Sequence, residues 1–249
     1  TPKEKNVWLF SATMPSEVRT ISANYMKNPA ELTVGKQNSG ADNLEHFYYV
    51  VHERDRYIAL RRILDSTPEI FGVVFCRTKL DTQRIAENLI KDGYNADALH
   101  GDLSQQQRDK VMNRYRNRSL QVLVATDVAA RGIDVQDISH VIHNHLPDEI
   151  ENYTHRSGRT ARAGKSGISI VLVNMKEIYK IRQIEKKLNK KFHLGKIPDA
   201  VDIGEQQLLH FIRKIHTVEV NEKGLAKYLE PVYKEFEGLT KEEIIKRIV

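Results

Sequence analysis

The strongest constraint on the fold is an alternation between short apolar runs and segments with helical periodicity. Seven runs rich in β-branched residues predict strands: Val7–Phe10, Phe47–Val51, Phe71–Cys76, Ala96–His100, Leu120–Thr126, Ile138–His143 and Ile168–Val173. Between them, apolar side chains recur every three or four residues, as at Tyr57, Leu60, Ile63 and Leu64. Such spacing is typical of amphipathic helices. The alternation therefore favours a parallel sheet with helices on both faces.

The alternation predicts one doubly wound α/β domain, from residue 41 to residue 195. In such sheets ligands bind beyond the carboxyl ends of the strands. The residues that follow each apolar run are therefore the first place to look for function.

Residues 1–40 fall outside this alternation. They predict a strand, a helix opened by Pro15, a second short strand and a linker. One or two strands do not make a domain, so we expect this segment to be the end of a larger unit.

The carboxy-terminal segment, residues 196–249, predicts three amphipathic helices after Pro198. Leu208, Phe211, Ile212 and Ile215 form an apolar stripe, and Thr240–Glu243 has the pattern of a capping box. About fifty residues of such helix bury little surface alone. We expect them to pack on the α/β domain, on each other or on a second copy, and a homodimer through residues 200–249 is favoured.

Composition limits the partners and the compartment. The chain has 39 Lys+Arg and 33 Asp+Glu, a net charge of +6, which allows a polyanion such as nucleic acid. The single cysteine, Cys76, excludes an internal disulfide and a multi-cysteine metal site, and core packing is its simplest role. No run approaches the roughly 18 apolar residues of a membrane span. We therefore expect no membrane partner and a cytoplasmic setting.

Three arginines recur at intervals of three residues, at Arg156, Arg159 and Arg162. In a helix they would share one face, and a solvated basic face is the ordinary explanation. Arginine at all three positions, beside Gly158, also suits forked recognition of phosphate oxygens. An arginine aimed at a transferring phosphoryl group would stabilise charge in the transition state.

Two further segments follow predicted strands. From Thr126 to Asp134, a hydroxyl, exposed amides and a glycine would cradle a phosphate, and Asp134 would accept hydrogen bonds from ribose hydroxyls. The alternative is a helix cap at Asp127 and a turn at Gly132. From His100 to Arg108, amides at a helix start and the Arg108 side chain would grip a sugar-phosphate strand.

Two patterns match known sites less well. The segment Gly158–Ser166 ends in Gly-Lys-Ser, but its first glycine is one residue too far away for a P-loop and no strand precedes it. His143 and His145 lack a third ligand at metal spacing, so we expect no metal site there.

Six blocks, in order, resemble the carboxy-terminal RecA-like domain of DEAD-box ATP-dependent RNA helicases. The blocks are Ser11-Ala12-Thr13, Val74–Thr78, His100-Gly101-Asp102, Gln105–Arg108, Thr126–Asp134 and His155–Arg162. The resemblance covers residues 1–195 and implies a RecA-like doubly wound parallel sheet. Residues 196–249 more weakly resemble the helical extension of bacterial cold-shock-type members.

The resemblance implies roles for matching positions around ATP. Arg159 and Arg162 would contact the γ-phosphate, and Asp134 the ribose. Gly132 would lie at the nucleotide, and His155 would bridge to the first RecA-like domain.

The resemblance also implies an RNA-binding set and a coupling pair. Backbone contacts would hold any single strand of suitable shape, independently of base sequence. The RNA set is Arg77, Thr78, Gly101, Arg108 and Thr126, and the coupling pair is Ser11 and Thr13.

Two family elements do not occur in this sequence, the Gly-Lys-Thr phosphate loop and the Asp-Glu-Ala-Asp box. The family places both in its amino-terminal domain, with Mg²⁺. We therefore expect the second half of a helicase, which partners its own N-terminal RecA-like domain and does not hydrolyse ATP alone. Two alternatives stay open: a stand-alone RNA-binding and dimerisation module, and a DNA helicase of the same superfamily.

Overall fold

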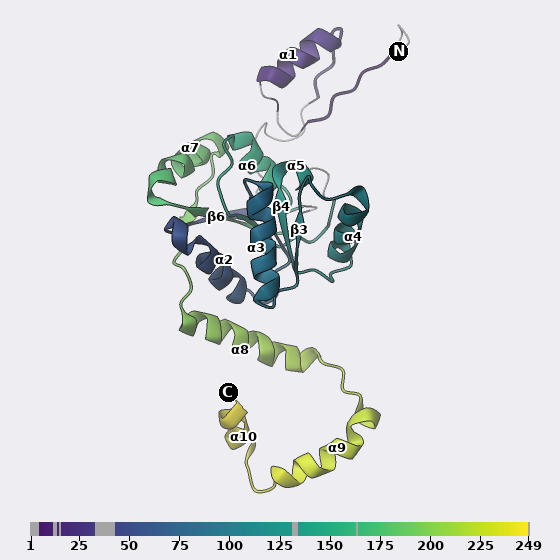
Figure 1. The fold of residues 1–249 in the computed structure, drawn as a ribbon, viewed down its shortest axis with the longest axis vertical. Coiled ribbons are helices and arrows are strands. Elements are labelled where there is room, and N and C mark those ends of the chain that lie inside the picture. The colour runs from purple at the N-terminus through teal and green to yellow at the C-terminus, as the bar shows by residue number, and fades with distance from the viewer. Residues whose placement is uncertain are drawn as a thin grey trace. The chain divides into compact units, whose positions relative to one another are not determined.

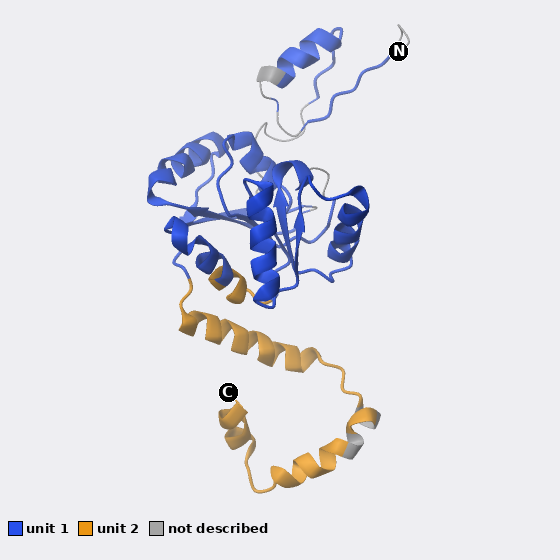
Figure 2. Ribbon diagram, viewed as in Figure 1, with its two compact units in different colours: residues 1–61, 69–197 blue, residues 62–68, 198–249 orange. Residues whose placement is uncertain are grey.

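The computed structural model describes residues 5–11, 14, 16–32, 43–130, 134–162 and 164–248. It divides into two compact units (Figure 2). The first comprises residues 1–61 and 69–197, and contains the sheet. The second comprises residues 62–68 and 198–249.

Seven parallel strands form one sheet in the order β3-β4-β2-β5-β6-β1-β7 (Figure 1). The strands are β1 (Leu44–Val50), β2 (Gly72–Cys76), β3 (Ala96–Leu99), β4 (Val122–Thr126), β5 (His140–His143), β6 (Gly167–Val173) and β7 (His193–Leu194). The predicted doubly wound α/β fold is confirmed, because strands that are consecutive in the chain are joined by crossovers rather than hairpins.

Helices connect the strands and form the carboxy-terminal segment. They are α1 (Ser16–Tyr25), α2 (Arg56–Asp65), α3 (Lys79–Lys91), α4 (Gln105–Arg116), α5 (Asp127–Ala130), α6 (Ile150–Ser157), α7 (Ile178–Leu188), α8 (Ala200–Thr217), α9 (Glu222–Glu235) and α10 (Lys241–Ile248). Two short 3₁₀ helices, Glu53–Asp55 and Met175–Glu177, precede α2 and α7.

Alternation along β2 divides the core between the two faces of the sheet. Val73 and Phe75 pack in one buried cluster with Val111 and Tyr115 of α4. Val74 and Cys76 point to the opposite face, where α2 and α3 lie (Figure 1). Both faces are therefore covered, as the continuous apolar strands predict.

The same register places α6 and α7 on the α4 face. Phe75 of β2 lies opposite His143 of β5, and His143 lies opposite Val171 of β6. Val171 belongs to a second buried cluster with Tyr153 of α6 and Ile181 of α7. Ala129 and Ala130 of α5 belong to the same cluster as Phe75, so α5 and α6, which precede and carry candidate site residues, share one face of the sheet.

The predicted strand at Val7–Phe10 is wrong. Residues 5–11 have an irregular backbone, and Trp8 and Phe10 are exposed and stacked on each other. A strand needs a neighbouring strand to pair its N–H and C=O groups, and no described strand pairs with this run. The predicted helix after it is confirmed as α1, whereas Pro15 lies outside the described residues.

The second unit holds the three predicted helices. The Thr240 backbone N–H donates to Glu243 Oε2 (2.8 Å), and the Glu243 N–H donates to Thr240 Oγ1 (3.2 Å), which confirms the capping box before α10. Among the described residues, no helix is both long enough and apolar enough to cross a membrane.

Cys76 is expected to resist thiol reagents at pH 8 until the domain unfolds. It is buried at the end of β2, and burial raises the pKa of its thiol to about 12, so the native protein offers neither thiolate nor access. Alkylation by iodoacetamide, followed by mass spectrometry, should give no adduct in buffer and one adduct per chain in concentrated urea. Labelling in buffer at the rate of a free thiol would show that β2 is not protected.

Candidate functional site

The predicted RNA-binding residues gather at the carboxyl edge of three adjacent strands. Arg77 and Thr78 follow β2, Gly101 follows β3, and Thr126 ends β4. Since parallel strands end at the same edge, their loops lie side by side. The edge therefore combines a guanidinium, two hydroxyls and a glycine backbone.

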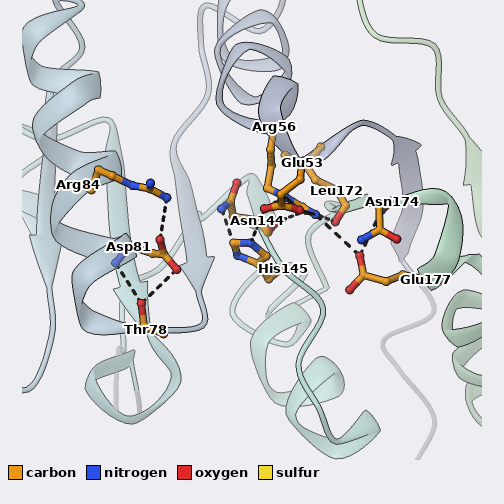
Figure 3. A network of polar contacts seen from close by, with 10 residues as sticks. All are labelled: Glu53, Arg56, Thr78, Asp81, Arg84, Asn144, His145, Leu172, Asn174 and Glu177. Atoms are coloured by element: carbon orange, nitrogen blue, oxygen red, sulfur yellow. Dashed lines mark hydrogen bonds and ion pairs between the residues drawn. The ribbon is translucent and has the colours of Figure 1, made fainter.

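Helix caps set the orientation of these loops. Thr78 caps α3, because its Oγ1 accepts from the Asp81 N–H (3.1 Å), and Arg84 also contacts Asp81 (Figure 3). Ser104 and Gln107 form a capping box at α4. Arg108, in the first turn of α4, then reaches the Ala129 carbonyl of α5 (3.4 Å). Arg108 therefore links the loops after β3 and β4.

Carboxylates accompany the cations at this edge. Arg77 pairs with Asp148 at 3.6 Å, and Lys79 pairs with Asp102 at 2.8 Å. All four side chains are exposed, and exposed pairs are weak. A phosphate group would compete with these carboxylates for the two cations.

The expected single face of arginines is wrong. α6 ends at Ser157, with Gly158 as its C-cap, so Arg159 and Arg162 lie in the turn that follows. Arg156 points into the core and is only 3% exposed. The helical periodicity does not continue past Gly158, because the N–H groups of Arg159 and Thr160 donate to carbonyls three residues earlier and Ala161 has a φ of 57°.

The turn after α6 brings two arginines and an aspartate together. Arg159 Nε donates to the His155 carbonyl (3.3 Å), and Arg162 Nε donates to the Gly158 carbonyl (2.9 Å). Arg162 Nη1 also donates to Asp134 Oδ1 (3.3 Å). Three of the four residues of the predicted ATP set, Arg159, Arg162 and Asp134, therefore lie close together.

The electrostatics of this turn favour an anion. Burial, and then the neighbouring charge of Arg162, lower the pKa of Arg159, while Asp134 opposes the shift. A hollow of about 350 Å³ is lined by Arg159, Arg162, Lys165 and Ser139. A second hollow, of about 270 Å³, is lined by Arg159, His155 and Phe75. An anion near the two guanidiniums would relieve their mutual repulsion.

Two predicted site residues, Thr13 and Gly132, lie outside the described residues. Ser11 lies in the irregular segment of residues 5–11.

An ion pair that sequence reasoning missed, between the buried Arg156 and the partly exposed Asp127, connects the two sets. Arg156 donates to both carboxylate oxygens of Asp127, with Nη2 at 2.7 Å from Oδ2, and its Nη1 donates to the His145 carbonyl (2.8 Å). Asp127 directly follows Thr126 of the RNA set, and Arg156 lies one turn before Arg159. The pair therefore ties the end of β4 to the arginine turn.

A second buried arginine, Arg56, contacts the ends of two strands (Figure 3). Arg56 Nη1 donates to the carbonyls of Asn144 (2.6 Å) and Leu172 (2.7 Å), at the ends of β5 and β6. Glu53 and Glu177 balance its charge. The His145 carbonyl, which accepts a hydrogen bond from Arg156, is therefore held at a defined position.

The two histidines at the end of β5 have separate partners. His143 Nε2 is hydrogen-bonded to Ser157 (3.1 Å) and Ser169 (3.2 Å), whereas His145 Nε2 lies 3.3 Å from Glu53. Burial, aided by the charge of Arg156, lowers the pKa of His143 well below its usual value. Within the described ranges, no group of three or more His, Cys, Asp or Glu side chains is placed to hold a metal ion.

Acidification is expected to destabilise the domain through its buried histidines. Burial lowers the pKa of His140 from 6.5 to about 4. The unfolded chain therefore takes up this proton first as the pH falls, so stability is complete above pH 6.5 and is lost towards pH 4. At pH 5 the loss is about 2 kcal/mol for this histidine.

The measurement is urea unfolding at pH 7.5 and at pH 5. His140→Gln should reduce the difference between the two free energies of unfolding. The exposed His216→Gln should leave it unchanged. Equal stability of the parent chain at both pH values would contradict a depressed pKa.

Comparisons with known proteins match both units. Residues 55–164 match the family model described as helicase conserved C-terminal domain, and residues 203–249 match the model described as probable ATP-dependent RNA helicase, helical domain. Among solved structures, the E. coli DEAD-box protein SrmB bound to regulator of ribonuclease activity A has a sequence 34% identical to this chain. The match covers 62% of this chain and 91% of that chain, with a TM-score of 0.58. The chain belongs to the DEAD-box helicase family.

Other DEAD-box proteins match over longer stretches of this chain. The DEAD-box ATP-dependent RNA helicase CshA of Geobacillus kaustophilus is 37% identical over 87% of this chain and 46% of its own length. S. cerevisiae Dbp5 bound to RNA and ADP BeF3 is 27% identical, over 82% of this chain and 56% of that chain, with a TM-score of 0.74. The chain spans about half the length of the curated DEAD-box relatives it matches, and its sheet is the RecA-like C-terminal helicase domain.

Proposed function

We propose that the chain is the C-terminal half of an ATP-dependent RNA helicase, which couples ATP hydrolysis to sequence-independent strand separation or remodelling of RNA–protein complexes. The observation that carries the proposal is the arrangement of Arg159, Arg162 and Asp134 beside the Arg156–Asp127 ion pair. This pair connects a phosphate-binding turn to a nucleic-acid-binding edge. A stand-alone RNA-binding and dimerisation module would need no such connection.

The ATP side of the proposal rests on the arginine turn. Arg159 and Arg162 donate to the γ-phosphate and stabilise the charge that develops as it is transferred. Asp134 accepts hydrogen bonds from the ribose, Gly132 lies at the nucleotide, and His155 contacts the amino-terminal helicase domain. Relatives such as CshA are named as ATP-dependent.

Mg²⁺ belongs to the amino-terminal domain in this proposal. Of the carboxylates near the turn, Asp127 is paired with Arg156 and Asp134 with Arg162. A carboxylate engaged by a guanidinium is a poor ligand for a hard cation. Bound Mg²⁺ would supply charge neutralisation at the β- and γ-phosphates.

The RNA side of the proposal rests on the edge of β3, β4 and β2. Arg77, Thr78, Gly101, Arg108 and Thr126 contact the sugar-phosphate backbone, so binding does not depend on base sequence. The Dbp5 structure, which is similar to this chain, holds RNA. Ser11 and Thr13 couple the state of the nucleotide to RNA binding.

The proposed organisation has three parts. Residues 1–40 belong to the end of the amino-terminal helicase domain and a linker, 41–195 to the C-terminal domain, and 196–249 to the helical extension. Exposed apolar side chains on the extension, including Phe211, Tyr228 and Val232, support a homodimer through residues 200–249.

ATP hydrolysis by the chain alone and by a protein carrying both helicase domains tests the proposal. We expect no turnover by the chain alone, because it lacks the phosphate loop. The two-domain protein should hydrolyse ATP faster with single-stranded RNA than with DNA of the same sequence. If the chain alone hydrolyses ATP when RNA is added, and Arg159→Ala abolishes this activity, the proposal that hydrolysis needs both helicase domains is wrong. RNA affinity equal in both proteins and independent of ATP would favour the binding module.

A further inference from the structure

The two residues between Arg159 and Arg162 are buried, although the turn itself lies at the surface. Thr160 is 2% exposed and Ala161 is 8% exposed. Neither residue has an assigned role in ATP binding, so their burial needs a separate explanation. Thr160 and Ala161 attach the turn to the sheet through contacts with the residues before β5 and with the start of β6.

The Thr160 hydroxyl attaches the turn to the entry of β5. It donates to the Ile138 carbonyl and lies 3.2 Å from the Ser139 carbonyl. Its backbone N–H donates to the Ser157 carbonyl of α6 (3.2 Å). Thr160 therefore links the end of α6 to the residues that lead into β5.

Ala161 adopts a left-handed backbone conformation, with φ of 57°. This conformation is unfavourable for a residue with a Cβ, because the Cβ comes too close to the following carbonyl oxygen. Such a conformation persists only where the surrounding structure imposes it, and it is often found at functional sites. The bonds of Thr160 on one side of Ala161 supply part of that constraint.

Gly167, the first residue of β6, supplies the rest. A Cβ at this position would lie 2.7 Å from the Ala161 nitrogen and 2.8 Å from Thr160 Cγ2. The Gly167 N–H donates to the Asn43 carbonyl (3.1 Å), and the N–H of Ile168 donates to the Ser139 carbonyl (3.0 Å). Because β6 is fixed by these bonds, only glycine lets the turn approach this closely.

We propose that Thr160, Ala161 and Gly167 are positioning residues that set the spacing of Arg159 and Arg162 for the γ-phosphate. The proposal rests on the proposed function. With the intervening backbone fixed against β5 and β6, the two Cα atoms keep a constant separation. Each Nε then donates to the carbonyl four residues earlier, which orients both guanidiniums.

Thr160→Val in the two-domain protein tests the proposal, because it keeps the shape of the side chain and removes the donor. Displacing a catalytic group by about 1 Å costs up to about 100-fold in rate, so we expect kcat for ATP hydrolysis to fall about 10- to 100-fold. RNA affinity should stay within about twofold, because the RNA edge is formed by other loops. Thr160→Ser, which retains the hydroxyl, should restore most of kcat.

Tyr115→Phe is the matched control. Its hydroxyl is also buried and donates to a backbone carbonyl, that of Gly72 in β2 (3.1 Å), which is not one of the carbonyls that Thr160 contacts. The Tm of the two variants in thermal melts should fall by similar amounts, because each loses one buried hydrogen bond. Only Thr160→Val should lose kcat. Gly167→Ala provides a second variant, with an expected loss of kcat and no change in RNA affinity.

The outcomes separate this proposal from the proposed function. Suppose that the two-domain protein hydrolyses ATP, that Arg159→Ala abolishes hydrolysis and that Thr160→Val keeps full kcat. The positioning role is then overturned, while the proposed function stands. It is also overturned if kcat and RNA affinity fall together with the folded fraction. If Arg159→Ala has no effect on hydrolysis, the proposed function itself fails.

Discussion

Replacing Arg159 by alanine is expected to lower kcat for ATP hydrolysis about 10³-fold in the protein that carries both helicase domains. The guanidinium stands half-buried beside Arg162, with its Nε oriented by the His155 carbonyl. Its contribution arises mainly in the transition state, where charge builds on the transferred group. Arg159→Lys is expected to recover little, because lysine lacks the planar fork and the Nε donor.

Steady-state hydrolysis at saturating RNA gives the measurement, and RNA affinity is measured in parallel. Arg182→Ala is the control, because Arg182 is an exposed arginine of α7 paired with Glu185. It should retain the parent kcat. If kcat of Arg159→Ala stays within about tenfold of the parent value, Arg159 does not stabilise the transition state.

The fold was predictable because buried parallel strands leave a strong pattern. β2, Gly72-Val73-Val74-Phe75-Cys76, is buried on both faces, so its sequence is almost continuously apolar. β7 was missed, because two residues paired at the sheet edge carry no such pattern. The apolar run Val7–Phe10 was misassigned, because an apolar sequence does not ensure a neighbouring strand.

The site was predictable only in part. Motif spacing predicted a common role for Arg159, Arg162 and Asp134, which the structure brings close together, whereas helical periodicity alone would put Arg156 on the face of the other two arginines. No carboxylate lies within four residues of Arg162 in the sequence, yet the fold brings Asp134 to 3.3 Å. Pairs formed across 28 or 29 residues depend on tertiary packing, which local spacing does not encode.

Arg156 and Asp127 give the two binding regions a common support. Thr126 and Asp127 are adjacent in the chain, so a shift of Asp127 moves a predicted RNA contact. Arg156 lies in the last turn of α6, so its shift moves Arg159. Arg156 also donates to the His145 carbonyl, and Arg56 donates to the carbonyl of the preceding residue, Asn144. A change at this pair should therefore affect stability and both of the proposed binding regions.

Asp127→Ala is expected to lower the free energy of unfolding by about 3 kcal/mol, because it leaves the buried charge of Arg156 without its counter-ion. Protection of Cys76 from alkylation is the appropriate measurement. Cys76 lies in the core of the α/β domain, whereas the single tryptophan, Trp8, is exposed in the amino-terminal segment. A loss of 3 kcal/mol corresponds to about a 150-fold loss of protection.

Two comparisons identify the cause of that loss. Glu242→Ala removes one partner of an exposed pair, Lys246–Glu242 on α10, and should cost less than about 0.5 kcal/mol.

In Asp127→Ala/Arg156→Met the buried charge is gone and the methionine fills part of its volume, so the double variant should be more stable than Asp127→Ala alone. If the double variant is instead less stable, by the sum of the single effects, then Arg156 contributes through packing on Phe75 rather than through the ion pair. The binding regions would in that case be joined by the sheet alone, and RNA affinity should survive the loss of Asp127.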